Sequence, residues 1–175
     1  MNSRLFWYMG AFCLVVLMIL PPSAIADLTI SSLRNGEYYI IEWNTRDKFT
    51  NKVRLINGKY EWQDLRLTDY ELVEMDKVAL GDLNGDGRKD AAVILWHNTG
   101  GSGSVCQVAA VLDSNGRPQH IASRNLGDRT EIKSLAIING YIVINLDNPR
   151  FYPGQQKVVK YKLVGNKLVG PDPFK

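Results

Sequence analysis

The apolar positions of this chain fall in short, strand-like runs, and after residue 26 none shows the spacing of an amphipathic helix. No segment keeps apolar residues at i, i+3, i+4 and i+7 over three turns. Residues 91–96 form a continuous apolar run, which is typical of a buried strand. Residues 71–80 mix apolar and charged side chains, as a half-buried strand does. The pattern therefore predicts about nine or ten strands and no helix.

Turn-forming pairs separate several of these runs. They are Asn35-Gly36, Asn57-Gly58, Asn115-Gly116, Asn139-Gly140 and Gly165-Asn166. Asn and Gly tolerate the positive φ that both central residues of a type I′ hairpin turn require. We expect hairpins of 52–56 with 59–62, 108–112 with 120–122, 132–138 with 141–144, and 158–163 with 167–169. Consecutive hairpins predict an all-β, mostly antiparallel meander, either closed as a barrel or folded as a sandwich.

A polar bend at residues 82–90 lies between two of the predicted strands. Side-chain oxygens stand at loop positions 1, 3, 5 and 9, which are Asp82, Asn84, Asp86 and Asp90. Calcium takes about six to eight oxygen ligands, and spacing by two lets the oxygens of a tight turn converge. Gly87 stands at position 6, where such loops turn sharply. Three carboxylates this close repel one another without a cation, so the pattern favours a Ca²⁺ loop over a solvated turn.

The bend is not a complete EF-hand. Position 12 is Val93, where an EF-hand has a bidentate Glu, and the flanking residues lack helical periodicity. Arg88 at position 7 would offer only its backbone carbonyl. Four or five protein oxygens plus water leave little room for a substrate, so we expect an ion that stabilises the fold. Its affinity should be modest, with Kd about 10⁻⁴–10⁻³ M, as in extracellular modules.

The stretch Gly-Asp-x-Asn-Gly-Asp-Gly-x-x-Asp-Ala at 81–91 resembles the calcium motif of FG-GAP and integrin-type repeats. The resemblance implies that the ligand positions are Asp82, Asn84, Asp86, Arg88 and Asp90. A propeller of such repeats needs the motif in every blade, and here it occurs once. The resemblance therefore extends to the loop and not to a propeller.

A second, looser resemblance runs from about residue 33 to residue 168. It is to a family of exported bacterial domains of unknown function that carry one such loop. The residues that carry it are 100–103 and 126–129. Members of that family often have a Cys pair before the last hairpin, whereas residues 151–155 of this chain contain no Cys.

The first 26 residues have the pattern of an export signal peptide. Arg4 supplies the positive charge, residues 5–20 are uncharged and mostly apolar, and residues 24–26 form a small-x-small cleavage site. The apolar run is shorter than the roughly 20 residues that span a bilayer. We expect no membrane span after cleavage, a periplasmic or secreted location, and a single β-domain at 27–175. An uncleaved anchor is the alternative.

Composition after residue 26 narrows the class of protein further. The 149 residues that remain are a one-domain length, and their net charge of +2 is too mild to imply nucleic acid or an anionic membrane. One cysteine, Cys106, remains in an apolar run, so no internal disulfide can form. We expect its thiol to be buried, and pairing between chains is the alternative.

Several other residues are candidate sites. The Gly-rich stretch 96–104 is followed by a strand rather than a helix, which favours a hairpin loop over a phosphate cradle. His97 and His120 have no spaced metal partners, so exposed or hydrogen-bonded roles are expected. The pair Asp128 and Arg129 is expected to fix a loop rather than to clamp a ligand carboxylate.

The last hairpin and the loop before it offer two further surfaces. Phe151 and Tyr152 are expected to cap the core, with stacking on a sugar as the alternative. Lysines give the hairpin a basic face at Lys157, Lys160, Lys162 and Lys167. We interpret them as protection of an edge strand against pairing with other chains.

No set of residues predicts catalysis. Ser102 and Ser104 lack the Gly-x-Ser-x-Gly elbow between a strand and a helix. We therefore expect a non-enzymatic, exported calcium-binding β-domain that binds another macromolecule or a glycan of the cell envelope. The alternative is a metal-assisted hydrolase of the periplasm or the cell exterior, with Asp82, Asp86 or Asp90 near the substrate. A subunit of a larger surface assembly is a third hypothesis, and the oligomeric state is open.

Overall fold

The computed structural model describes residues 26–41, 49–66, 69–147 and 155–173, which form an all-β, antiparallel fold. The described part contains one short helix, α1 (Ile30–Arg34), and eleven strands. The strands are β1 (Glu37–Ile41), β2 (Phe49–Arg54), β3 (Lys59–Asp64), β4 (Asp69–Gly81), β5 (Asp90–Asn98), β6 (Val105–Ser114), β7 (Arg117–Asp128), β8 (Glu131–Ile138), β9 (Tyr141–Asp147), β10 (Gln156–Val164) and β11 (Lys167–Val169).

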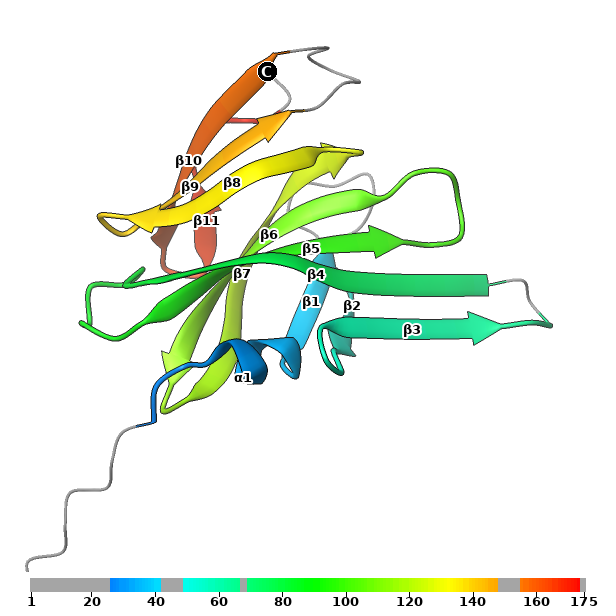
Figure 1. The fold of residues 1–175 in the computed structure, drawn as a ribbon, viewed down its shortest axis with the longest axis horizontal. Helices are drawn as coiled ribbons and strands as arrows, with labels where there is room; N and C mark the ends of the chain where they lie inside the picture. The colour runs from blue at the N-terminus through cyan, green and yellow to red at the C-terminus, as the bar shows by residue number, and fades with distance from the viewer. Residues whose placement is uncertain (1–25, 42–48, 67–68, 148–154, 174–175) are drawn as a thin grey trace, which may run out of the picture.

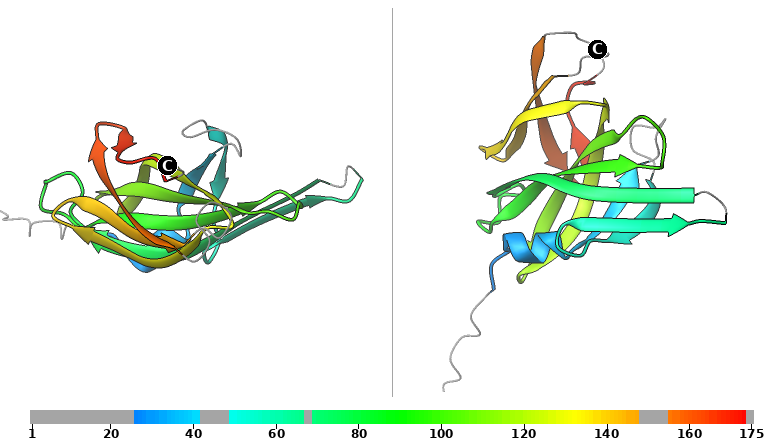
Figure 2. Two further views of the ribbon diagram at one scale, coloured as in Figure 1. Left: turned by 90° about the horizontal axis from the view of Figure 1, so that it is seen from above. Right: turned by 45° about the vertical axis from the view of Figure 1, so that its right-hand side comes forward.

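The strands form three sheets, one of which is central (Figures 1 and 2). The central sheet has the order β3-β4-β5-β6-β7, and a second sheet has the order β11-β10-β9-β8. The third sheet is the pair β1-β2. The described strands do not close into a barrel, so of the two expected architectures the sandwich is the one observed. The prediction of an all-β, mostly antiparallel fold is confirmed.

Both faces of the central sheet are covered. Ala92, Ile94 and Val108 point to one face and pack with Ile142 and Tyr161 of the second sheet. Residues at the alternate positions of β5 and β6 point to the other face and pack with α1, β1 and the segment after β2; they include Ala91, Val93, Leu95, Ala109 and Val111. This explains why 91–96 reads as a continuous apolar run, since a strand buried on both sides has no polar face.

Three of the expected hairpins are present. Asn115-Gly116 joins β6 to β7, Asn139-Gly140 joins β8 to β9, and Gly165-Asn166 joins β10 to β11. Asn115 and Asn139 have φ of 56° and 51°, the positive values that the Asn-Gly pattern predicts. The bend at 82–90 joins β4 and β5, as expected for a loop between two strands.

The turn at Asn35-Gly36, the hairpin across Asn57-Gly58 and the absence of a helix were wrong predictions. Asn35 is the C-cap of α1 rather than part of a hairpin turn. Thr29 and Ser32 cap the start of α1 by reciprocal hydrogen bonds, a local signal that an apolar stripe cannot reveal in five residues. Asn57-Gly58 does turn the chain, but its flanking strands enter different sheets, since β2 pairs with β1 and β3 pairs with β4.

The interpretation of the last hairpin also needs correction. β11 pairs only with residues 162–164 of β10, so Lys162 lies between two strands, whereas Lys157 and Lys160 are paired with β9 alone. Edge protection therefore fits Lys157, Lys160 and Lys167 but not Lys162. Cys106 is free and buried, as expected for an apolar thiol. Among the described residues, no helix is long and apolar enough to cross a membrane.

Candidate metal centre

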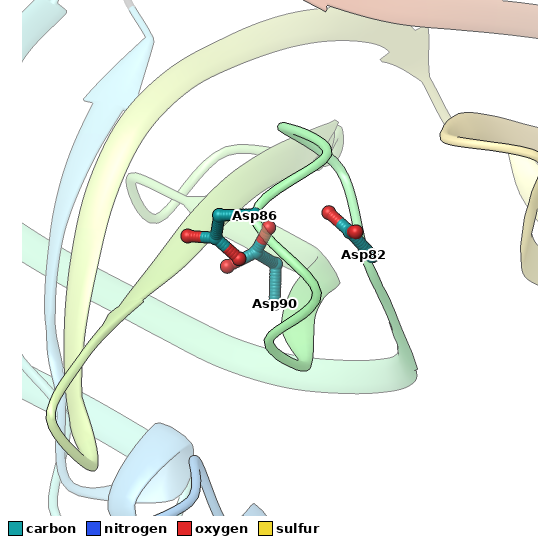
Figure 3. A group of neighbouring side chains, drawn as sticks. All are labelled: Asp82, Asp86 and Asp90. Carbon is teal, nitrogen blue, oxygen red and sulfur yellow. The ribbon is translucent and has the colours of Figure 1, made fainter.

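Three carboxylates come together at the bend between β4 and β5. One oxygen from each of Asp82, Asp86 and Asp90 lies within 4.8 Å of the others. Figure 3 shows Asp82 pointing across the bend toward the other two. Two oxygens bound at about 2.4 Å to one calcium ion are at most about 4.8 Å apart, so the spacing fits a single ion. This group could hold a metal ion, and no other such acidic or His/Cys group occurs among the described residues.

Hydrogen bonds within the bend set the direction of its side chains. Asp82 accepts hydrogen bonds from the backbone N–H of Gly85 at 2.6 Å and of Gly87 at 2.9 Å. Asp86 Oδ1 accepts one from the N–H of Arg88 at 2.8 Å. Gly85 and Gly87 have φ of 84° and 80°, the left-handed region that favours glycine. The glycines therefore let the chain fold back over its own carboxylates.

Asn84 lies next to the carboxylate group. Its Nδ2 donates to Asp86 Oδ2 at 2.9 Å, and its Oδ1 accepts from the Asp86 N–H at 3.0 Å. An amide oxygen has two lone pairs, so this bond leaves capacity for a cation. The roles of Asn84 and of the Arg88 carbonyl as metal ligands stay predictions.

Asp90 anchors the bend to the sheet. Its side chain is fully buried, and its two oxygens accept hydrogen bonds from the N–H of Leu83 and of Asp113, both at 2.9 Å. Leu83 is itself buried in the core between the two larger sheets. The Leu83 side chain of the loop thus packs in the core, while the carboxylates of Asp82, Asp86 and Asp90 converge on one point.

The carboxylates differ in how easily they ionise. Burial raises the pKa of Asp90, and the nearby Asp86 and Asp82 raise it further, although two backbone N–H groups act in the opposite direction. Hydrogen bonds from the N–H groups of Gly87 and Gly85 lower the pKa of Asp82. A cation at the group would favour the ionised form of Asp90 and remove the repulsion from its neighbours.

The Arg88 side chain has a role that the sequence did not reveal. Its Nη2 lies 2.6 Å from Asp113 Oδ2, and its Nη1 donates to Asn115 Oδ1 at 3.0 Å. Asp113 also accepts a hydrogen bond from the Gly116 N–H at 2.6 Å. Asp113 therefore ties the cation loop to the turn between β6 and β7. Its position before an Asn-Gly turn gives no sequence signal for this contact.

The second sheet packs against the base of the loop. A Cβ atom at Gly81 would lie 2.8 Å from Ile137 of β8, so only glycine allows this approach. Beside the loop is a hollow of about 390 Å³, lined in part by Asp82, Asn139 and Lys162. The loop therefore lies where the two larger sheets meet.

The two histidines are structural. His120 Nδ1 accepts a hydrogen bond from the Tyr39 N–H at 2.8 Å, while Nε2 lies 2.8 Å from Ser123 Oγ. Burial lowers the pKa of His120 to about 4, so the ring is neutral at pH 7. His97 is buried rather than exposed, with Nε2 3.3 Å from Glu71 Oε1. Burial lowers the pKa of His97, and Glu71 opposes that shift.

The Gly-rich loop is held as the sequence suggested. Asp128 Oδ1 accepts a hydrogen bond from the Ser104 N–H at 3.0 Å, and Arg129 Nη2 donates to the Ser102 carbonyl at 3.0 Å. The pair thus fixes the loop between β5 and β6. Phe151 and Tyr152 lie outside the described residues.

Comparisons of the chain with protein-family models, with curated proteins and with solved structures found no match. The functional interpretation therefore depends on the residues and geometry of the site itself.

Proposed function

We propose that this protein is an exported β-domain in which one Ca²⁺ ion, bound by the loop at 82–90, stabilises the fold. In this proposal the domain is not an enzyme, and it binds a macromolecule or a glycan of the cell envelope. The convergence of Asp82, Asp86 and Asp90 on one point carries the proposal. The signal-like first 26 residues support export to the periplasm or beyond.

The chemistry of the donors favours calcium. Asp82, Asp86 and Asp90 offer only oxygen, the ligand that hard cations prefer, whereas zinc sites are built mainly from Cys and His. Asn84 Oδ1 and the Arg88 carbonyl would raise the number of protein ligands to five, with water completing the shell. The resemblance to FG-GAP loops supports the same assignment.

The surroundings of the loop favour a structural role for the ion. Asp90 opens β5, Asp82 follows β4, and Leu83 between them lies in the core. An ion held by both aspartates would clamp the ends of two neighbouring strands. At a calcium concentration ten times Kd, binding stabilises the native state by about 1.4 kcal/mol.

Thermal unfolding with calcium and with chelator tests this role. Calcium should raise the Tm of the wild-type chain by about 4 °C at ten times Kd. D86A should lose the shift, because the exposed Asp86 contributes one carboxylate to the group. D69A, which removes an exposed carboxylate at the far end of β4, is the matched control and should keep it. An equal Tm in calcium and chelator for the wild type would contradict the proposal.

A metal-assisted hydrolase is the second candidate. The hollow that Asp82 shares with Asn139 and Lys162 favours it, because a substrate there would lie beside the ion. A panel of p-nitrophenyl esters and phosphates discriminates between the two. Hydrolysis that D86A abolishes at an unchanged Tm would favour the hydrolase, whereas parallel loss of stability and activity would favour the structural ion.

A further inference from the structure

The outward face of the sheet β8–β11, here called the outer face, carries an unusual share of the exposed apolar side chains. Among the described residues, eleven large hydrophobic side chains are exposed, and five of them lie on this face. They are Ile138, Tyr141, Val158, Val164 and Val169, each between 44% and 58% exposed. Such a concentration on one surface, rather than scattered residues, indicates an interaction site.

Strand register places these side chains next to one another. Tyr141 is opposite Ile138 on one side and Lys162 on the other, and Lys162 is opposite Val169. In the next row, Lys160 is opposite the half-buried Val143. Two lysines of β10 thus stand in the middle of the apolar side chains.

The charge of the outer face is positive. Lys160 and Lys162 lie on β10, and Lys167 lies on β11 opposite Val164. None of the residues paired with these three is acidic. The strand-paired carboxylates of the face are Asp147 and Glu131, opposite each other at the far end of β9 and β8, and Asp82 lines the same hollow as Lys162.

Edge protection does not account for Lys162, because its stretch of β10 is paired with both β9 and β11. Lys160 lies where β10 pairs with β9 alone, and it lines a shallow hollow of the outer face with Ile138, Tyr141 and Val143. Lys162 Nζ donates to the Gly140 carbonyl at 3.0 Å and lies 5.0 Å from the centre of the Tyr141 ring, which keeps it within the apolar surface. Two copies docked face to face would bring these lysines together, so like charge disfavours self-association.

We propose that the outer face docks on an anionic lipid bilayer. Tyrosine is enriched at membrane interfaces, lysine stems extend along apolar surface toward phosphate groups, and each lysine near an anionic leaflet adds attraction. Lysine is depleted at protein interfaces, which makes a protein partner a poorer fit. A single aromatic side chain offers little stacking surface for a glycan. The mild net charge of the chain does not argue against lipid binding, because the lysines concentrate positive charge on the outer face.

Co-sedimentation with lipid vesicles tests this proposal. The probe is the signal-processed chain purified from the periplasm of a bacterial host, with calcium present. Binding is expected to vesicles of phosphatidylglycerol and phosphatidylcholine and to weaken as salt is raised. Vesicles of phosphatidylcholine alone should bind at least about tenfold less. All variants share one N-terminus, so differences between them report the outer face.

Two variant pairs locate the contact. K160E/K162E should bind at least about tenfold more weakly than wild type. K59E/K77E changes net charge equally at lysines of the central sheet and should bind as wild type does. Y141S should weaken binding severalfold, whereas W62S, which removes an exposed aromatic of β3, should not. Melting curves confirm that each variant is folded.

Three results would overturn the proposal. One is equal binding to neutral and anionic vesicles. The second is equal loss in K160E/K162E and K59E/K77E. The third is binding to an anionic polysaccharide such as polygalacturonate but not to vesicles, which would point to an acidic glycan. The outer face contains no proposed metal ligand, so failure of the calcium assignment would not by itself overturn this proposal.

Discussion

The central sheet and the sheet β8–β11 differ in how their strands are buried. In the central sheet, β5 is buried on both faces from Asp90 to Leu95. In the other sheet, β9 alternates, with Ile142, Ile144 and Leu146 buried and the residues between them partly or fully exposed. A strand covered on both sides has no surface left for recognition, whereas a strand covered on one side presents every second residue to solvent.

In the proposed function, the central sheet contributes stability and the outer face contributes recognition. The central sheet contributes buried apolar residues to both core clusters, about half of each, and the cation loop joins two of its strands. The second sheet contributes one face to the core, and on its outer face side chains such as Tyr141 and Val158 are exposed among the described residues. The loop lies at the junction, where Gly81 meets Ile137.

The largest expected effect comes from single substitutions that compare the buried strand β5 with the outer face of β10. I94A removes a fully buried side chain from the middle of β5 and should lower the free energy of unfolding by about 4 kcal/mol. V158A removes an exposed side chain from β10 and should change it by less than about 0.5 kcal/mol. Urea unfolding measures both. Similar losses would show that the outer face is covered in solution.

A second prediction sharpens the roles of two aspartates in one loop. In chelator, D90A should lower the free energy of unfolding by about 3 kcal/mol, because it leaves the buried N–H groups of Leu83 and Asp113 without an acceptor. D86A, at an exposed position, should cost less than about 1 kcal/mol. Equal losses of unfolding free energy in D90A and D86A, measured by urea unfolding without calcium, would contradict the different roles assigned to the two aspartates.

The pattern of the sequence predicted the loop and the hairpins β6–β7, β8–β9 and β10–β11, because all of them follow local rules. Continuous apolar runs indicated burial, and oxygen side chains at alternate positions indicated the convergence now seen for Asp82, Asp86 and Asp90. The Asn-Gly rule worked at Asn115 and Asn139, where both flanking strands belong to one sheet.

Long-range partners could not be predicted in the same way. Asn57 has the positive φ of a hairpin turn, yet the choice of partner for β2 and β3 depends on distant strands. The bond between Arg88 and Asp113 spans 25 residues and has no local pattern. Edge protection was the wrong interpretation for Lys162, because the sequence does not reveal which residues of β10 the short strand β11 covers.

A third, smaller effect concerns the face of the central sheet that β1 covers. There the ring of His120, on β7, accepts a hydrogen bond from the Tyr39 N–H of β1. Its folded-state pKa is about 4, below the ordinary 6.5, so the unfolded chain takes up a proton first as pH falls. Stability should therefore fall between pH 6.5 and 4, by on the order of 2 kcal/mol. H120Q should lose this part of the pH dependence in urea unfolding, and H97Q should keep it. An identical profile for H120Q and wild type would contradict the neutral, buried assignment.

Calcium titration calorimetry at pH 7 tests the central claim most directly. The wild-type chain should bind one ion with Kd about 10⁻⁴–10⁻³ M, and D82N/D86N, which removes two of the three converging carboxylates, should release no binding heat. Absence of binding by the wild type at millimolar calcium, or an unchanged isotherm for D82N/D86N, would contradict the assignment of this loop as the calcium site.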